Sequence, residues 1–231
     1  MPALKVNDEV ITESGVVAQF LADAHPSHLV PASDAPGGAL RRARISFFAD
    51  TFIGKFHSHL LKIIWSTKTA EEAAEAERAA VAAAVKELEP LLADAAPFFG
   101  GSDKLTLAEV GSLITNTHMY THTHSLTLAL THMHTLEYSH TLTFTLTLSH
   151  THTYIIPLTK LQVLTGSFVQ RLVICIEAGG VYSDGLGPSL QEQAPNFWKW
   201  AKAVAVHPSV TGLFEEAAWV EWTKAKIASR I

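Results

Sequence analysis

The spacing of hydrophobic positions changes from a strand period to a helix period near the start of the chain. Residues 3–12, ALKVNDEVIT, alternate on both sides of Asn7-Asp8 and predict two short strands joined by a turn. Residues 13–26, ESGVVAQFLADAHP, then place apolar side chains at a helical spacing, with Ser14 as the expected N-cap of a helix that begins at Gly15. Prolines and glycines up to Gly38 predict a linker after this first unit.

The pattern that follows is mostly helical. Residues 39–65 carry Phe48, Phe52 and Phe56 at a spacing of four, which is typical of one face of a long helix. Residues 70–92 predict a second helix, rich in Ala and Glu, with a proline near its end.

A capping box begins the next predicted helix. In Thr106-Leu107-Ala108-Glu109, the threonine caps the helix and Glu109 reaches back to the amide of the cap residue. Helical spacing returns at Val163 and continues in two terminal segments that contain four tryptophans. Glycines and a proline predict a loop over residues 179–188.

Residues 110–162 interrupt this pattern with a low-complexity tract of Thr, His, Leu and Ser, such as THTHSLTLAL. One interpretation is a metal site, because imidazoles bind zinc, copper and nickel, but the tract lacks recognisable ligand spacings. A second is a β-prone insertion, because segments such as TLTFTLTL alternate with a period of two. Eight of the thirteen histidines fall in it: His118, His122, His124, His132, His134, His140, His150 and His152.

A third interpretation, a retained intron, explains more of the tract. Alternating His and Thr is what a CA dinucleotide repeat encodes. Removing 110–162 joins Glu109 to Val163 and gives TLAEVLTGSFVQRLVICIEA, one uninterrupted amphipathic helix behind its cap. We therefore expect the tract not to be a functional element, and expect no physiological metal site.

Composition narrows the class of protein. The 231 residues are 48% hydrophobic and 17% charged, as in globular proteins. A formal net charge of -5 argues against nucleic-acid binding, and no apolar run is long enough to predict a membrane span. The first residues lack a secretory signal pattern, and the single cysteine, Cys175, suits a reducing compartment. These features predict a cytoplasmic protein.

With the tract set aside, the chain resembles the cytosolic glutathione S-transferases, in particular omega-like members. The resemblance rests on several short motifs in the family's order. These are Met1-Pro2-Ala3-Leu4, Glu13-Ser14 before a helix, Phe98-Phe99-Gly100, Thr106-Leu107-Ala108-Glu109, Pro195-Asn196-Phe197 and His207-Pro208-Ser209-Val210. Glu109 stands where the family usually has Asp.

The resemblance implies an α+β fold, mostly α. Residues 1–27 would be a truncated thioredoxin-like, glutathione-binding domain, and residues 28–38 the linker. Residues 39–109 and 163–231 would form an all-helical C-terminal domain. The family also implies a homodimer, glutathione as substrate with no other cofactor, and a small hydrophobic electrophile as the second substrate.

The family's glutathione site maps onto Met1, Pro2, Glu13 and Ser14. Amides at a helix N-terminus and a hydroxyl suit the γ-glutamyl carboxylate, while Glu13 suits the ligand's ammonium group. Phe48 and Phe52 have two interpretations, either as a pocket for the hydrophobic substrate or as core residues.

We assign no catalytic residue from the sequence. The family's thiolate-stabilising Tyr, Ser or Cys belongs to a segment that would precede Met1, and Cys175 has the apolar setting of a buried cysteine. The predicted function is conjugation of glutathione to electrophiles, or glutathione-dependent thiol transfer, impaired in this chain and of the kind used in detoxification. The alternative is a non-catalytic interaction module of the translation-factor type.

Overall fold

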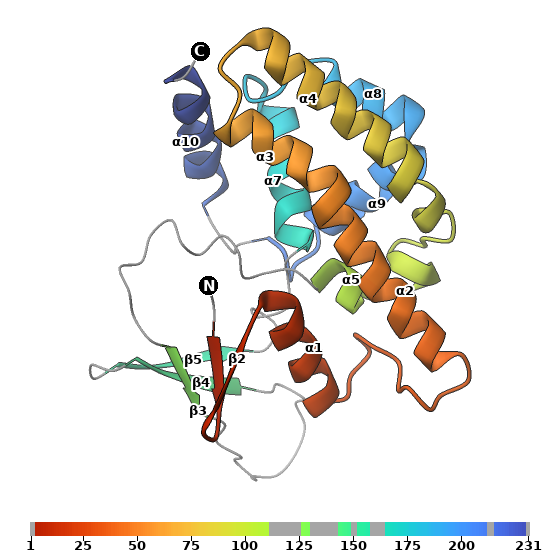
Figure 1. Cartoon of the computed structure of the whole chain (residues 1–231), viewed down its shortest axis with the longest axis vertical. Helices are drawn as coiled ribbons and strands as arrows, with labels where there is room; N and C mark the ends of the chain where they lie inside the picture. The colour runs from red at the N-terminus through yellow and green to blue at the C-terminus, as the bar shows by residue number, and fades with distance from the viewer. Residues whose placement is uncertain are drawn as a thin grey trace.

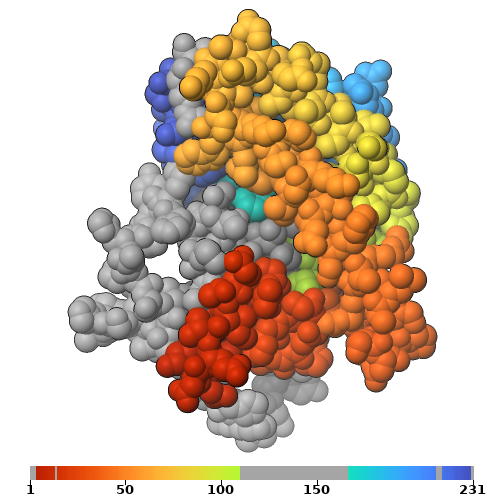
Figure 2. Space-filling model, viewed as in Figure 1, coloured from red at the N-terminus to blue at the C-terminus, as the bar shows by residue number. Residues whose placement is uncertain are grey.

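The computed structural model describes residues 3–110, 126–129, 143–148, 152–157, 165–211 and 215–229. A small N-terminal unit of two strands and one helix lies beside a larger assembly of helices (Figure 1). In the space-filling view, the helices between residues 38 and 92 cover one side of that assembly (Figure 2). The predicted architecture, mostly α with a small β component, is confirmed.

The N-terminal unit begins with the predicted hairpin. Strand β1 (Ala3–Val6) pairs antiparallel with β2 (Glu9–Thr12), in the register Leu4↔Ile11. Asn7 turns the chain with φ 55°, a conformation that asparagine tolerates better than most residues. Helix α1 (Ser14–Ala24) follows directly, but its N-cap is Glu13 and not Ser14. The helix therefore begins one residue earlier than the capping pattern indicated.

Two long helical segments form the visible face of the larger assembly. The first is continuous from α2 (Gly38–Thr51) through the π-helical η1 (Phe52–His57) to α3 (Ser58–Trp65). The second runs from α4 (Ala70–Ala83) through the π-helical η2 (Ala84–Leu88) and the 3-10 turn η3 (Pro90–Leu92). Thr69 caps α4 by accepting a hydrogen bond from the Glu72 amide. Both predicted helices are confirmed.

The remaining helices pack behind this pair. They are the 3-10 turn η4 (Phe99–Gly101), α5 (Leu107–Val110), α7 (Thr165–Ala178), α8 (Leu186–Gln193), α9 (Pro195–Ala205) and α10 (Glu216–Ala228). Helix α8 corrects the prediction of a loop over residues 179–188. Gly187 brings α8 close to α7, because an added Cβ would lie 2.8 Å from Ile176 Cγ2. Pro188 is tolerated in the first turn, where its missing N–H has no intrahelical partner.

The tract contains three described strands. β3 (Leu126–Ala129), β4 (Thr143–Leu148) and β5 (His152–Pro157) form an antiparallel sheet in the order β3-β4-β5. These segments agree with the β-prone interpretation of the tract. The seven histidines of the tract that precede His152 lie outside the described residues, and the retained-intron interpretation stays a prediction.

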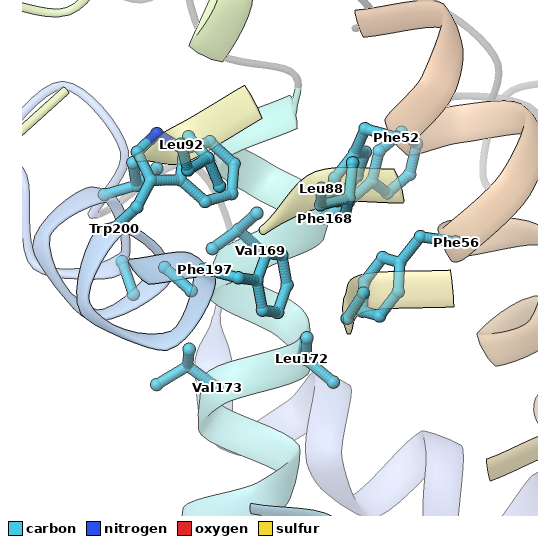
Figure 3. Packing of buried hydrophobic residues seen from close by; sticks show 14 of the residues in the cluster. Phe52, Phe56, Leu88, Leu92, Phe168, Val169, Leu172, Val173, Phe197 and Trp200 are labelled. Carbon is cyan, nitrogen blue, oxygen red and sulfur yellow. The ribbon is translucent and has the colours of Figure 1, made fainter. Parts of the chain in front are cut away.

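Aromatic side chains fill the centre of the helical assembly. Phe48, Phe52, Phe56, Phe197 and Trp200 are all at most 1% exposed. Ring centroids are 5.2 Å apart for Phe48 and Trp200 and 4.9 Å apart for Phe56 and Phe197. Figure 3 shows side chains of α7, such as Val169 and Leu172, packed among the labelled rings of η1 and α9. Such rings each bury 150–250 Å², so this cluster dominates the packing energy of the domain.

Candidate functional site

The most unusual backbone near the predicted glutathione site is at Glu13. Its φ of 68° and ψ of 124° lie outside the helical and left-handed regions, and Asn7 is the other non-glycine residue with positive φ in the described chain. A conformation of this kind costs about 1–3 kcal/mol and is concentrated at functional sites. The carbonyl of Glu13 still accepts the first helical hydrogen bond, from the Val17 amide at 2.9 Å.

The Glu13 geometry leaves ligand-binding groups exposed. Glu13 is exposed, and its side chain makes no capping hydrogen bond to α1. The first-turn amides of α1 therefore have no side-chain cap. The positive end of the helix dipole lies at these same amides, so an anion is stabilised there. A ligand that carries both a carboxylate and an ammonium group matches these amides together with the Glu13 carboxylate.

Three other predicted glutathione-binding groups lie outside what the structure describes. Met1 and Pro2 are outside the described residues, and Ser14 is described only in its backbone. The structure thus places Glu13 and the Ser14 backbone together at the start of α1. The contribution of the other groups stays a prediction.

Phe48 and Phe52 are buried in the helical assembly. They are 0% and 1% exposed, and Phe48 lies against Phe99 with ring centroids 4.8 Å apart. Their burial agrees with the core interpretation, and a hydrophobic-substrate pocket at these residues stays a prediction. Helical spacing alone cannot separate these interpretations, because it gives the face of a helix and not what covers that face.

Polar contacts of Arg42 and Leu107 connect α1 and the linker to the helical domain. Arg42 forms an ion pair with Asp23 on α1 and donates to the Pro31 carbonyl at 3.2 Å. The pKa of Asp23 is lowered, first by a hydrogen bond from Gln19 and then by Arg42. The Leu107 amide also donates to the linker at the Leu29 carbonyl, at 2.8 Å. These contacts fix the position of α1 relative to α2 and α5.

Glu109 does much more than the capping box predicted. Its Oε2 accepts from the Thr106 amide at 2.7 Å and from the Thr106 hydroxyl at 2.8 Å. Its Oε1 accepts from the Phe99 amide at 2.8 Å and from Trp200 Nε1 at 2.9 Å. The carboxylate is fully buried and joins α5, η4 and α9. Sequence analysis found the cap but not the two distant donors.

His57 is a buried polar side chain of η1. It lies against Phe168, with ring centroids 4.1 Å apart, and neither ring nitrogen has a hydrogen-bond partner. Burial, and secondarily the charge of Arg171, lowers the pKa of His57 to about 3. The imidazole is therefore neutral at physiological pH.

Cys175 has the properties of a structural thiol. It is 1% exposed, and burial raises the pKa of its thiol to about 11. The thiolate is the reactive form, so a buried thiol with a raised pKa is a poor nucleophile.

The part of the chain that the structure describes contains no group of three His, Cys, Asp or Glu side chains placed to hold a metal ion. None of its helices has the length and apolar character that crossing a membrane requires.

Comparisons with known proteins support the fold. No protein-family model and no curated protein sequence matches the chain. The chain is similar to the crystal structure of rice GST1 (OsGSTU1) in complex with glutathione, with a TM-score of 0.53 and 20% sequence identity. The alignment covers 94% of this chain and 70% of the rice chain. The chain therefore has a glutathione-transferase-like fold, with a partial thioredoxin-like unit and a helical C-terminal domain.

Proposed function

We propose that this chain is a glutathione S-transferase-like protein that binds the γ-glutamyl end of glutathione at Glu13 and the start of α1. The observation that carries the proposal is the positive-φ conformation of Glu13 directly before an uncapped helix. The rice structure with a similar fold contains glutathione, which makes glutathione the first ligand to test.

The proposed contacts follow from charge. The γ-glutamyl carboxylate would accept from the first-turn amides of α1 and from the Ser14 hydroxyl, because anions are stabilised at helix N-termini. The Glu13 carboxylate would accept from the ligand's ammonium group, as a charge-assisted hydrogen bond. Because Glu13 is already held in an unusual conformation, less ordering is required when the ligand binds.

We propose binding without efficient conjugation. Catalysis in this family needs a group that stabilises the glutathione thiolate, and Cys175 is excluded from this role by its burial and raised pKa. The burial of Phe48 and Phe52 also leaves the site of a hydrophobic electrophile unassigned.

Isothermal titration of the full chain with glutathione tests the proposal. We expect saturable binding that Glu13→Gln weakens by about tenfold, because the ammonium group loses its charged acceptor. Cysteinylglycine, which lacks the γ-glutamyl group, should bind weakly and with no difference between the two proteins. Glu9→Gln is the matched control, because Glu9 is an exposed glutamate of β2, the strand that ends just before Glu13.

Two results would contradict the assignment. Wild-type protein that gives no saturable heat with glutathione would remove the binding function. Equal affinities for wild type and Glu13→Gln would show that glutathione binds elsewhere. A conjugation assay with a chromogenic electrophile separates binding from catalysis, and rapid turnover would contradict the proposed impairment.

An interaction module is the second candidate, favoured by an apolar pair on α2. Leu40 and Phe47 are 68% and 57% exposed and, seven residues apart, lie on one side of the helix. The homodimer that the family resemblance implies would use the same pair, Leu40 and Phe47, as part of its interface. Sedimentation velocity of wild type and of a Leu40→Ser/Phe47→Ser variant tests this use. A wild-type protein that is monomeric at all concentrations would remove the homodimer from the proposal.

A further inference from the structure

A hollow of about 620 Å³ lies between α4 and α8, which are neighbours at the top of Figure 1. We name it the α4–α8 hollow, and its volume falls within the range of small-molecule sites, roughly 300–1,000 Å³. Its lining comes from α3, α4, α8, α10 and the segment that joins α7 to α8. Among the residues that the structure describes, the lining takes none from the hairpin or from α1, so the hollow is separate from the proposed glutathione site.

The walls of the α4–α8 hollow are mainly apolar, and several of them still have exposed surface. Ala73 and Ala74 of α4 are half-buried, and so is Ile227 of α10. Val181 and Leu186, which also line the hollow, are 6% and 2% exposed and belong to the hydrophobic core. An apolar ligand can therefore lie against the three half-buried side chains while the core behind them stays in place.

A buried carboxylate also lines the hollow. Glu77 of α4 is 9% exposed, and each of its oxygens accepts a hydrogen bond from Ser183. Oε1 accepts from the Ser183 amide at 2.8 Å, and Oε2 accepts from the Ser183 hydroxyl. These two contacts fix the carboxylate between α4 and the segment before α8, so little further ordering is required when a ligand binds to it.

The hydrogen bonds to Glu77 come from neutral groups and supply no opposite charge. Within the described part of the chain, Glu77 forms no ion pair. Burial of a carboxylate without an opposite charge is unfavourable, because the ion loses its hydration and gains no compensating attraction. A bound cation would supply that attraction.

Arg78 also lines the hollow, but its charge is offset by another residue. Arg78 Nη2 lies 2.6 Å from Glu75 Oε2, and the two side chains are 69% and 72% exposed. The Arg78–Glu75 pair is thus a neutral surface pair. Among the described residues that line the hollow, Glu77 therefore carries the charge that is not offset.

We propose that the α4–α8 hollow binds a small primary alkylammonium. Its ammonium group pairs with the Glu77 carboxylate, and its alkyl chain lies against Ala73, Ala74 and Ile227. An ammonium group is compact and has three N–H donors, and each Glu77 oxygen keeps a lone pair beside the one that Ser183 uses. A guanidinium fits less well, because it pairs with both carboxylate oxygens at once and each already accepts from Ser183.

Isothermal titration of the full chain with hexylamine at neutral pH tests this proposal. Hexylamine is then protonated, because the similar ammonium group of lysine has a pKa of about 10.4. We expect saturable binding that Glu77→Gln weakens about tenfold, because the ammonium group loses its charged acceptor. 1-Hexanol has the same chain without the charge and should bind more weakly, and equally to both proteins. Glu71→Gln is the matched control, because Glu71 is exposed on α4 and does not line the hollow.

A second variant, Ala74→Leu, keeps the charge and fills part of the hollow. It should weaken hexylamine binding as well, and circular dichroism shows whether each variant is folded. If Glu77→Gln does not fold, Ala74→Leu tests the position of the site, and the preference of the wild type for hexylamine over 1-hexanol tests the charge. Equal hexylamine affinities for wild type and either folded variant would overturn the proposal. So would equal affinities of the wild type for hexylamine and 1-hexanol, or no saturable binding at millimolar hexylamine.

Discussion

Replacing Glu109 with alanine should be among the most damaging single substitutions in the helical domain. The carboxylate is 0% exposed and accepts four hydrogen bonds from three different parts of the chain. Glu109→Ala leaves three buried donors without an acceptor: the Phe99 amide, the Thr106 amide and Trp200 Nε1. The Thr106 hydroxyl can rotate and is less affected.

The magnitude follows from these orphaned donors. Each buried unsatisfied donor costs about 1–3 kcal/mol, so three cost at least about 3 kcal/mol before any cavity is counted. We expect Glu109→Ala to lower the free energy of unfolding by about 3–6 kcal/mol. Native domains are stable by about 5–15 kcal/mol, so the variant should be close to unfolding.

Glu109→Gln provides a graded second variant. The amide oxygen can keep the position of Oε1 and still accept from Phe99 and Trp200. The amide nitrogen then replaces Oε2, and the Thr106 amide loses its acceptor. We therefore expect a loss of about 1–3 kcal/mol for Glu109→Gln, smaller than the loss for alanine.

Urea unfolding followed by far-ultraviolet circular dichroism measures both losses, and the fluorescence of the five tryptophans adds a second probe. Glu75→Ala is the control, because Glu75 is on the surface of α4 and its side chain is 72% exposed. The control should change stability by no more than about 0.5 kcal/mol. A Glu109→Ala variant as stable as this control would refute the reasoning, because it would show that the four hydrogen bonds contribute nothing net.

Three further predictions concern buried groups. The pKa of His57 is lowered from 6.5 to about 3, so between these pH values the unfolded state binds a proton that the folded state does not bind. The free energy of unfolding should therefore decrease as the pH falls from 6.5 to about 3. In His57→Phe, the urea midpoint should depend less on pH across this range. Cys175 should react with a thiol reagent in denaturant but hardly at all in the native protein, and rapid native labelling would contradict its burial. Gly38→Ala should lower the melting temperature, because the added Cβ would lie 2.0 Å from the Ala32 carbonyl oxygen. Gly54→Ala should raise the melting temperature, because its added Cβ has no neighbouring atom within 4 Å and alanine favours a helix more than glycine does.

Local sequence determined most of the secondary structure. The hairpin around Asn7-Asp8 and the long helices over 38–65 and 70–92 follow from short-range alternation, helical spacing and propensity. The Thr106–Glu109 cap was also predictable, because both its partners lie within one helical turn. Two local errors remain: the N-cap of α1 lies at Glu13, and α8 begins inside a segment whose glycines indicated a loop.

The tertiary structure decided which of these residues are available for chemistry. Phe48 and Phe52 fit a pocket or a core equally well until α9 and η4 cover them. Of three similar arginines, Arg42 pairs with Asp23 on a different element, while Arg41 and Arg44 line a hollow beside the linker. Spacing along a chain gives the face of an element, but burial and charge pairing depend on contacts between distant segments. The sequence alone therefore determined most of the elements and predicted the candidate site at Glu13, and the packing of distant helices determined which side chains are buried or paired.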